Sequence, residues 1–253
     1  MNPNALVILQ ARTASTRFPR KVLQKLNGQP MILRQLERVK LAKNIEQIVV
    51  ATTLDESDDE LTSLLEQYSY KVIRGSINDV LSRYLLVIDR YDFPVVVRLT
   101  ADCPLVMPDL IDSIVEEFAN SDVDYVSNTM NPTYPDGLDV EVFSSHALKK
   151  LSLINLSDQE KEHVTLGFHK YKEIFRLVSY ESSENLSDLR WTVDYPEDFK
   201  FVSQVYSHFS GLESEFRFGD ILELMKMRPD LKSTISANRR NEALSLQIRD
   251  ISK

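Results

Sequence analysis

The first feature of this sequence that could do chemistry is a basic loop near the N-terminus. Residues 5–10 (ALVILQ) have strand character and lead directly into it. Within ten residues it carries four positive charges: Arg12, Arg17, Arg20 and Lys21. Small and hydroxylated residues separate these cations, and such a loop at the end of a strand can hold the phosphates of a nucleotide. The alternative interpretation is a solvated basic surface loop.

Two aspartates are the second candidate feature. Asp102 ends the apolar segment 94–101, and Asp194 ends the segment 189–193. If both segments are strands of one open parallel sheet, their carboxyl ends meet at one edge, where ligands bind in such folds. Two carboxylates there suit an oxygen-seeking cation such as Mg²⁺. Each aspartate could instead cap a following helix, and the two interpretations are compatible.

The segment 133–143 (TYPDGLDVEVF) is a candidate sugar-binding element. It contains the turn sequence Pro-Asp-Gly and then a predicted strand with Asp139 and Glu141. These side chains could reach a sugar, or the segment could be an ordinary hairpin. His163 lies in a polar stretch (EKEHVT), where a ligand contact and a dimer contact are both open.

A third acidic pair, Asp122 and Asp124, matches the DxD pattern of metal-dependent glycosyltransferases. The simpler interpretation is that these residues introduce the predicted strand 122–128. Cys103 is the only cysteine, and we expect a small buried residue because no base is evident near it.

Composition narrows the class of protein. The chain has 253 residues with a formal net charge of −8, which argues against nucleic acid as a partner. A single cysteine excludes an internal disulfide framework. No apolar run is long enough to span a membrane, and the first residues lack the features of a signal peptide. We therefore expect a cytoplasmic protein that binds a small anionic ligand in one cleft.

Strand-like and helix-like segments alternate along the first half of the chain. The predicted strands are 46–53, 71–75 and 94–102, and the predicted helices are 31–42, 58–68, 77–91 and 109–119. This order predicts a mostly parallel sheet with helices on both faces. In the second half we predict strands at 122–128, 137–144, 174–180 and 189–193 and helices at 159–173 and 196–206. We expect a single domain (1–253) with a smaller β-rich part at about 125–185 and a peripheral tail at 227–253.

Several segments together resemble one family. Residues 8–39 (ILQARTASTRFPRKVLQKLNGQPMILRQLERV) resemble the N-terminal signature of the CMP-sugar synthetases, a superfamily of cytidylyltransferases. Further matches follow in the family's order up to about residue 206: VVATT, RGSINDVLSRY, RLTADCPL, YPDGLDVEVF, EHVT and RWTVDYPEDF. The pattern is most similar to the spore coat polysaccharide biosynthesis branch, which is related to the 3-deoxy-manno-octulosonate and acylneuraminate enzymes.

The resemblance implies a Rossmann-like three-layer α/β/α sandwich that forms a homodimer through a β-rich element. It implies that Asp102 and Asp194 hold Mg²⁺ and that Asp139, Glu141 and His163 lie near the sugar. The nucleotide-binding residues that it implies are Ala11, Arg12, Ser15, Arg17, Lys21, Arg74, Asn78 and Asp102. Among these, Arg12 and Lys21 would contact the phosphates, and Arg74 and Asn78 would lie near the base. The catalytic residues that it implies are Arg12, Lys21, Asp102 and Asp194.

The reaction implied is transfer of CMP from CTP to an acidic sugar with release of pyrophosphate, for surface polysaccharide or glycan biosynthesis. The sequence departs from the family at three places. Cys103 follows the first aspartate where the octulosonate enzymes have an acid, and Asn78-Asp79-Val80 replaces their Gln-Ser-Gly. Ala14 and Ser15 stand where the neuraminate-type phosphate loop has glycines. Two alternatives stay open. One is a glycosyltransferase that uses Asp122 and Asp124, and the other is a catalytically silent nucleotide-binding subunit.

Overall fold

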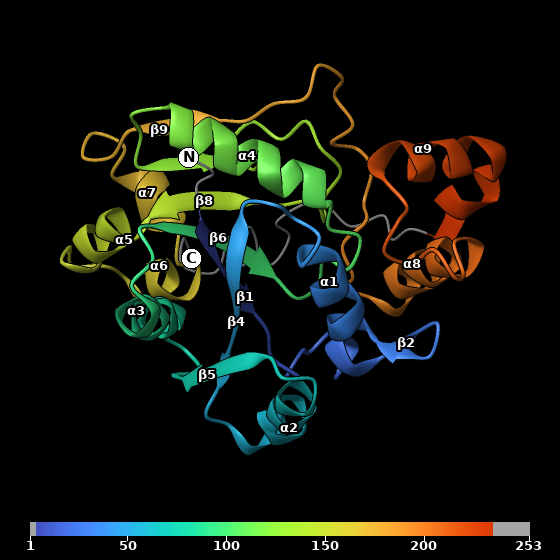
Figure 1. The fold of residues 1–253 in the computed structure, drawn as a ribbon, viewed down its shortest axis with the longest axis horizontal. Coiled ribbons are helices and arrows are strands. Elements are labelled where there is room, and N and C mark those ends of the chain that lie inside the picture. The colour runs from blue at the N-terminus through green and yellow to red at the C-terminus, as the bar shows by residue number, and fades with distance from the viewer. Residues whose placement is uncertain (1–3, 235–253) are drawn as a thin grey trace, which may run out of the picture.

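A seven-stranded, mostly parallel sheet forms the centre of the computed structural model, which describes residues 4–234 (Figure 1). The strand order is β5-β4-β1-β6-β8-β7-β9. The strands are β1 (Ala5–Gln10), β4 (Ile45–Thr53), β5 (Lys71–Gly75), β6 (Val95–Thr100), β7 (Tyr125–Ser127), β8 (Glu141–Ser144) and β9 (Leu177–Ser179). Strand β1 is central and pairs in parallel with β4 and β6, whereas β8 runs antiparallel to β6 and β7. A short hairpin of two two-residue strands, β2 (Lys25–Leu26) and β3 (Gln29–Pro30), lies apart from this sheet.

Helices cover both faces of the sheet, and alternate residues of β1 point into two hydrophobic cores. Ala5, Val7 and Leu9 pack with α1 (Met31–Val39), α2 (Asp59–Gln67), α4 (Pro108–Asn120), α8 (Pro196–His208) and α9 (Phe218–Met227). Leu6 and Ile8 pack with α3 (Val80–Tyr91), α5 (Ser145–Ser152) and α7 (Leu166–Lys170). Side chains alternate across a strand, so these apolar runs are buried on both faces. The predicted three-layer α/β/α class is confirmed.

Two of the predicted elements are wrong. Residues 189–193 form no strand, since a single bridge between Arg190 and Asp136 is their sheet-like pairing. The predicted helix 159–173 is two short helices, α6 (Asp158–Glu162) and α7, separated where Val164 takes a positive φ of 46°. A β-branched residue in that conformation cannot continue a right-handed helix.

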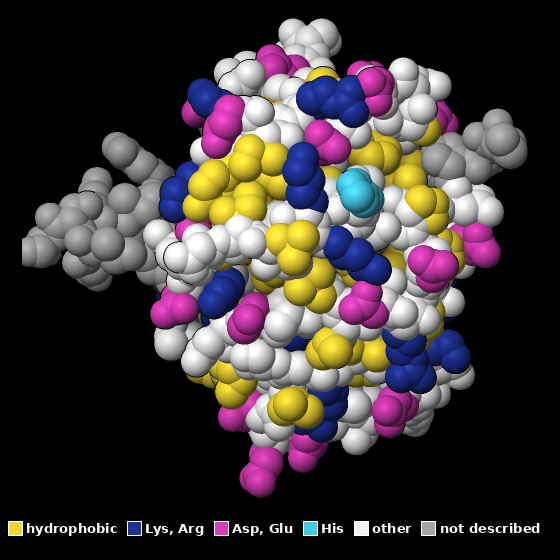
Figure 2. Space-filling model, turned by 90° about the vertical axis from the view of Figure 1, so that its left-hand side faces the viewer, with side chains coloured by type: hydrophobic (Ala, Val, Ile, Leu, Met, Phe, Trp, Pro, Cys, Tyr) yellow, Lys and Arg dark blue, Asp and Glu magenta, His cyan; other side chains and the backbone are white. Residues whose placement is uncertain are grey.

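Hydrophobic side chains reach the surface on one side of the molecule. The side that carries α3 and α5 exposes hydrophobic side chains between charged ones (Figure 2). Leu153, just after α5, is 87% exposed.

Near the C-terminal end of the described residues, the 3-10 helix η3 (Pro229–Thr234) places Leu231 in the core. The part of the predicted tail from residue 235 onward lies outside the described residues. Within residues 4–234, the helices are too short or too polar to cross a membrane.

Candidate active site

A buried carboxylate anchors the basic loop at the edge of the sheet. Asp58 is 1% exposed and accepts hydrogen bonds from the backbone N and the Oγ1 of Thr13, each at 2.7 Å. Its other oxygen accepts from the hydroxyls of Thr52 (2.9 Å) and Thr53 (2.5 Å) at the end of β4. Burial opposes the charge of Asp58, but hydrogen bonds from Thr53, Thr13 and Thr52 outweigh it and lower the pKa below its ordinary value. Asp58 therefore fixes the start of the loop to the neighbouring strand.

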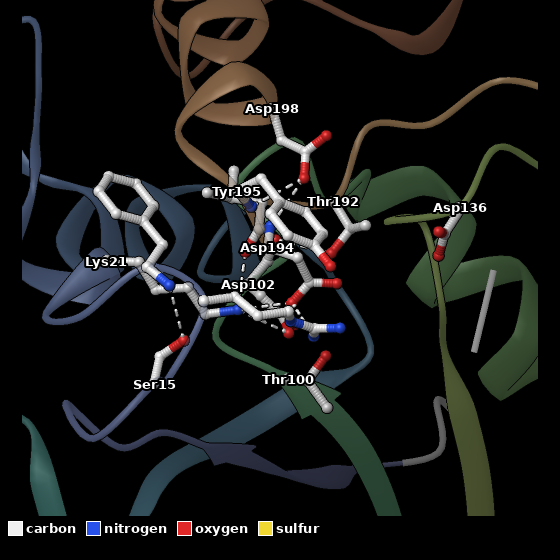
Figure 3. Close-up of polar contacts among 12 residues, drawn as sticks. Ser15, Lys21, Thr100, Asp102, Asp136, Thr192, Asp194, Tyr195 and Asp198 are labelled. Atoms are coloured by element: carbon white, nitrogen blue, oxygen red, sulfur yellow. Dashed lines mark hydrogen bonds and ion pairs between the residues drawn. The ribbon is translucent and has the colours of Figure 1, made fainter. Parts of the chain in front are cut away.

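The loop ends in a turn that directs Lys21 inward. Arg20 takes a left-handed conformation with φ of 59°, and Lys21 begins the short 3-10 helix η1 (Lys21–Leu23). The Lys21 Nζ lies 3.2 Å from Asp102 Oδ2, 3.0 Å from Asp194 Oδ1 and 2.7 Å from the carbonyl oxygen of Val193. Figure 3 shows the side chain reaching between the two carboxylates. Burial disfavours the ammonium, yet the two carboxylates outweigh this and raise the pKa of Lys21.

The two aspartates meet although their parent segments are not neighbouring strands. Asp102 follows the end of β6 by two residues, and its carbonyl oxygen accepts from the backbone N of Val193 at 2.8 Å. That bond places the segment before α8 beside the residues that follow β6, so Asp194 lies close to Asp102. Burial opposes the charge of Asp102, but the Lys21 ammonium and hydrogen bonds lower its pKa to about 2. The predicted juxtaposition is therefore present, with a loop segment in place of a strand.

Arginines hold Asp194 from the other sides. Arg190 donates to Asp194 Oδ2 at 2.9 Å and also pairs with Asp136 and Asp198. Arg17 lies 2.7 Å from Asp194 Oδ1, and its guanidinium lies 5.3 Å from the centre of the Tyr195 ring. Asp198, in the first turn of α8, accepts from the backbone N of Asp194 at 2.9 Å. The position of Asp194 is thus fixed through both its backbone and its side chain.

Two adjoining cavities meet at these charged groups. The first, of about 500 Å³, is lined by most of the predicted nucleotide-binding residues: Ala11, Arg12, Ser15, Arg17, Lys21 and Asp102. The second, of about 460 Å³, is lined by the predicted sugar-binding residues Asp139, Glu141 and His163. The residues that line both cavities are Gln10, Arg17, Arg98, Thr100, Asp102, His163 and Asp194. The geometry is one elongated site with Asp102 and Asp194 where its halves join.

The floor of the second cavity is a buried polar cluster on β6, β7 and β8. Glu141 is 5% exposed, pairs with Arg98 and accepts from the Tyr125 hydroxyl at 2.6 Å. Burial opposes the charge of Glu141, but the Arg98 guanidinium and hydrogen bonds lower its pKa. His169 also lines this cavity, and burial lowers its pKa. Glu141 is therefore held by the protein's own groups at the cavity wall.

Some predicted residues lie elsewhere. Arg74 and Asn78 line neither cavity. The Arg74 guanidinium donates to the carbonyl oxygens of Thr53 (2.7 Å) and Asp55 (2.9 Å) and pairs with Asp59, so it ties β5 to the start of α2. The position of this pair gives no geometric support to a contact with the nucleotide base.

The DxD pair also lies outside both cavities. Asp122 is exposed and pairs with Arg176, and Asp124 accepts from the backbone N of the same arginine at 2.9 Å. These contacts join the end of α4 to the segment before β9. The glycosyltransferase alternative is therefore not favoured.

Asp102 and Asp194 are the residues that could hold a divalent cation. Among residues 4–234, no group of three or more His, Cys, Asp or Glu side chains is arranged to hold a metal. Mg²⁺ needs only one or two carboxylates when the phosphates of a nucleotide and water complete its octahedral shell. The two aspartates already share one cation, the Lys21 ammonium, so their oxygens converge on a single point.

Several residues that build the site were not identified from the sequence, among them Asp58, Arg98 and Arg190. Asp58 is the first residue of the predicted helix 58–68, a position where an acidic residue is common and points to no other role. Arg98 carried a usable signal, because a charge inside the apolar strand sequence PVVVRLTAD requires a buried partner. Arg190 lies in a segment predicted as a strand. Of its three carboxylate partners, Asp136 comes from a distant part of the chain, and Asp194 and Asp198 follow it by four and eight residues.

Comparisons with known proteins agree with this geometry. Residues 6–221 match the family model for cytidylyltransferases. The chain is 32% identical over 234 residues to the spore coat polysaccharide biosynthesis protein SpsF of Bacillus subtilis, covering 89% of this chain and 95% of that protein. It is 34% identical over 124 residues to an 8-amino-3,8-dideoxy-manno-octulosonate cytidylyltransferase of Shewanella baltica, covering 46% of this chain and 47% of that enzyme.

Among solved structures, a cytidylyltransferase from Leptospira borgpetersenii serovar Hardjo-bovis superposes with a TM-score of 0.85 at 29% sequence identity. The match covers 94% of this chain and 100% of that one. The family match extends over both cavities and includes the basic loop, Asp102 and Asp194. The chain therefore belongs to the cytidylyltransferase family.

Proposed function

We propose that this protein transfers CMP from CTP to an acidic sugar and releases pyrophosphate, as a step in surface polysaccharide or glycan biosynthesis. One observation carries the proposal: Asp102 and Asp194 converge where the two cavities join. A nucleotidyl transfer needs a nucleotide on one side and an acceptor on the other, with charge stabilisation between them. The shape of the site supplies that division.

In this proposal the first cavity binds the triphosphate. Arg12, Arg17 and Lys21 contribute positive charge, and Ser15 and the backbone at Ala11 contribute hydrogen bonds to phosphate oxygens. Asp102 and Asp194 would hold Mg²⁺. When bound, that ion would neutralise charge that develops around the α-phosphate.

The second cavity would bind the acceptor, with Asp139 and His163 at its wall and Glu141 acting through its pair with Arg98. A sugar hydroxyl oxygen forms a bond to the α-phosphorus and gives up its proton to solvent water. The bond from that phosphorus to the bridging oxygen breaks, and its electron pair leaves on pyrophosphate. Positioning and charge stabilisation supply the rate enhancement, with no covalent enzyme intermediate.

The names of two relatives support the choice of acceptor. An octulosonate, the substrate named for the Shewanella enzyme, is a sugar acid, and the Bacillus relative is named for polysaccharide biosynthesis. In this chain, His163 and Arg17 are among the basic side chains that line the second cavity, which supports a contact with a sugar carboxylate. The single cysteine fits a reducing compartment, and we place the reaction in the cytoplasm.

We further propose a homodimer formed through the part of the chain at about 125–185. The side of the molecule with α3 and α5 exposes hydrophobic side chains (Figure 2). Two exposed ones, Leu153 (87%) and Ile174 (39%), belong to the proposed segment. Apolar side chains exposed in this way are typical of the core of a protein interface.

A screen of pyrophosphate release tests the proposed reaction. The four common nucleoside triphosphates are each combined with 2-keto-3-deoxy sugar acids and with neutral sugars, in the presence of Mg²⁺. We expect release with CTP and at least one sugar acid. Release with another nucleotide, or with neutral sugars alone, would overturn the assignment of substrates.

A further inference from the structure

The Lys21 ammonium takes the place between the two carboxylates that we assign to a metal. An ammonium has three hydrogen-bond donors. Its three acceptors here are Asp102 Oδ2 at 3.2 Å, Asp194 Oδ1 at 3.0 Å and the Val193 carbonyl oxygen at 2.7 Å. Lys21 therefore has no donor left for a phosphate oxygen while it holds this position (Figure 3). The assigned phosphate contact requires the side chain to leave the carboxylates.

The charges around the pair are already balanced. Two carboxylates face Lys21, and Arg17 adds a second cation at 2.7 Å from Asp194. Arg190 contacts the outer oxygen of Asp194 and is shared with Asp136 and Asp198. A divalent cation that entered beside Lys21 would meet like charge within a few ångströms at a partly buried site, where such repulsion is strong.

We propose that Lys21 is a resident cation that keeps a divalent metal out of the Asp102–Asp194 site until a nucleoside triphosphate binds. The phosphates offer the ammonium a stronger set of acceptors, and its four-carbon stem lets it swing from the carboxylates to them. The vacated oxygens of Asp102 and Asp194 then receive the metal. Nucleotide and metal thus bind as a coupled pair, with Lys21 as the positioning residue that couples them. This inference rests on the proposed function, because it takes the two aspartates as the metal site.

The test measures metal binding without turnover. Protein-bound Mn²⁺ is followed by water-proton relaxation enhancement, with and without saturating CTP and with no sugar present. Wild type is compared with Lys21→Met, Lys21→Arg and, as a matched control, Lys25→Met, which removes an exposed lysine of the hairpin β2–β3. Circular dichroism and thermal melting establish that each variant is folded.

We expect wild type and Lys25→Met to bind Mn²⁺ weakly alone and tightly with CTP. Lys21→Met should bind Mn²⁺ alone about tenfold or more tightly than wild type, because one positive charge has left the site. CTP should increase the affinity for Mn²⁺ by a smaller factor in that variant than in wild type. Lys21→Arg keeps the charge and should restore weak binding of Mn²⁺ alone.

Two results would overturn the proposal, and they differ in meaning. If Lys21→Met, or a folded Lys21→Gln where the first variant fails to fold, binds Mn²⁺ alone no more tightly than wild type, Lys21 does not exclude the metal. The metal assignment in the proposed function would survive that result. If wild type with CTP gains no bound Mn²⁺ and Asp102→Asn behaves identically, the metal assignment itself fails as well.

Discussion

At the scale of single residues, the site depends on charges that hold one another. Lys21, Asp102 and Asp194 form one cluster, and Arg98 with Glu141 forms a second in the adjoining cavity. The two aspartates of the first cluster and the pair in the second are held by partners from distant parts of the chain, so their positions are set before any ligand binds. Preorganised charge of this kind is what stabilises a phosphoryl transition state.

Asp58 gives a prediction at this scale. Asp58→Asn removes the charge and one of the two oxygens that accept from Thr13, Thr52 and Thr53, and we expect it to lower the free energy of unfolding by about 1–3 kcal/mol. Because Asp58 anchors the basic loop, KM for CTP should also rise. Urea denaturation and steady-state kinetics measure the two effects. An unchanged KM in a destabilised variant would show that the anchor does not position the loop.

Asp58 also predicts a dependence on pH. Its folded-state pKa lies below the ordinary value of 3.8, so its contribution to stability is complete above that value and is lost as the pH falls through the folded pKa. From about pH 5 to about pH 3, wild type should therefore lose stability more steeply than Asp58→Asn. Equal slopes would contradict the assigned ionised state of Asp58.

At the scale of elements, a turn and an extended segment set the distance between the two aspartates. Gly137 has φ of 106°, and a Cβ there would lie 2.3 Å from the backbone N of Thr192 and 2.5 Å from the carbonyl carbon of Trp191. The turn therefore presses directly on the segment that leads to Asp194. Only glycine permits both the conformation and the close approach.

Gly137→Ala should displace this segment. We expect a loss of about 2 kcal/mol or more in the free energy of unfolding, together with a loss of kcat. Gly219→Ala is the matched control, since its Cβ would meet no atom within 4 Å and its φ is ordinary. Comparable melting temperatures for the two variants would refute the close approach.

The sequence predicted the elements of the first half closely, because apolar and β-branched runs such as 46–53, which is buried from Val49 to Thr53, leave a clear pattern. The prediction of a strand for LRWTV (189–193) was wrong. Its apolar residues are buried, with Trp191 and Val193 fully so, but the segment packs across the ends of β6 and the 133–138 turn. Burial gives the same pattern in a strand and in such a segment. The antiparallel direction of β8 likewise depends on tertiary pairing that local periodicity does not encode.

The candidate site was predicted in part for a similar reason. Asp102, Asp194 and the basic loop were found because charges stood at the ends of apolar segments. Lys21 contacts two carboxylates that lie 81 and 173 positions further along the chain. No pattern of local spacing in the sequence predicts contacts between residues so far apart.

At the scale of the whole molecule, the sheet brings the site together at the carboxyl ends of β1 and β6, and the second half of the chain closes it with Glu141, His163 and Arg190. Ligand binding should therefore stabilise the whole fold. With CTP and Mg²⁺ at about 100 times the dissociation constant, the expected gain is about 2.7 kcal/mol, or roughly 5–10 °C in Tm. Differential scanning fluorimetry measures this, and an equal shift with ATP would contradict a preference for cytosine.

The proposed dimer is also a property of the whole molecule. Leu153→Asp places a charge on the exposed hydrophobic side, and we expect it to convert a dimer into a monomer without loss of fold. Leu212→Asp, at a 49% exposed leucine outside the proposed segment, is the control. Light scattering coupled to size-exclusion chromatography reads the mass directly. A wild-type monomer, or a Leu153→Asp dimer, would contradict the proposed interface.

The most direct test of the central claim is CTP-dependent pyrophosphate release by wild type, Asp102→Asn and Asp122→Asn with a sugar acid and Mg²⁺. Asp102 lies where the two cavities join, whereas Asp122 is exposed outside both cavities and pairs with Arg176. We expect Asp102→Asn to keep its fold and to lose at least about 100-fold in kcat, and Asp122→Asn to match wild type. Near wild-type release by Asp102→Asn, or its loss in Asp122→Asn, would contradict the account.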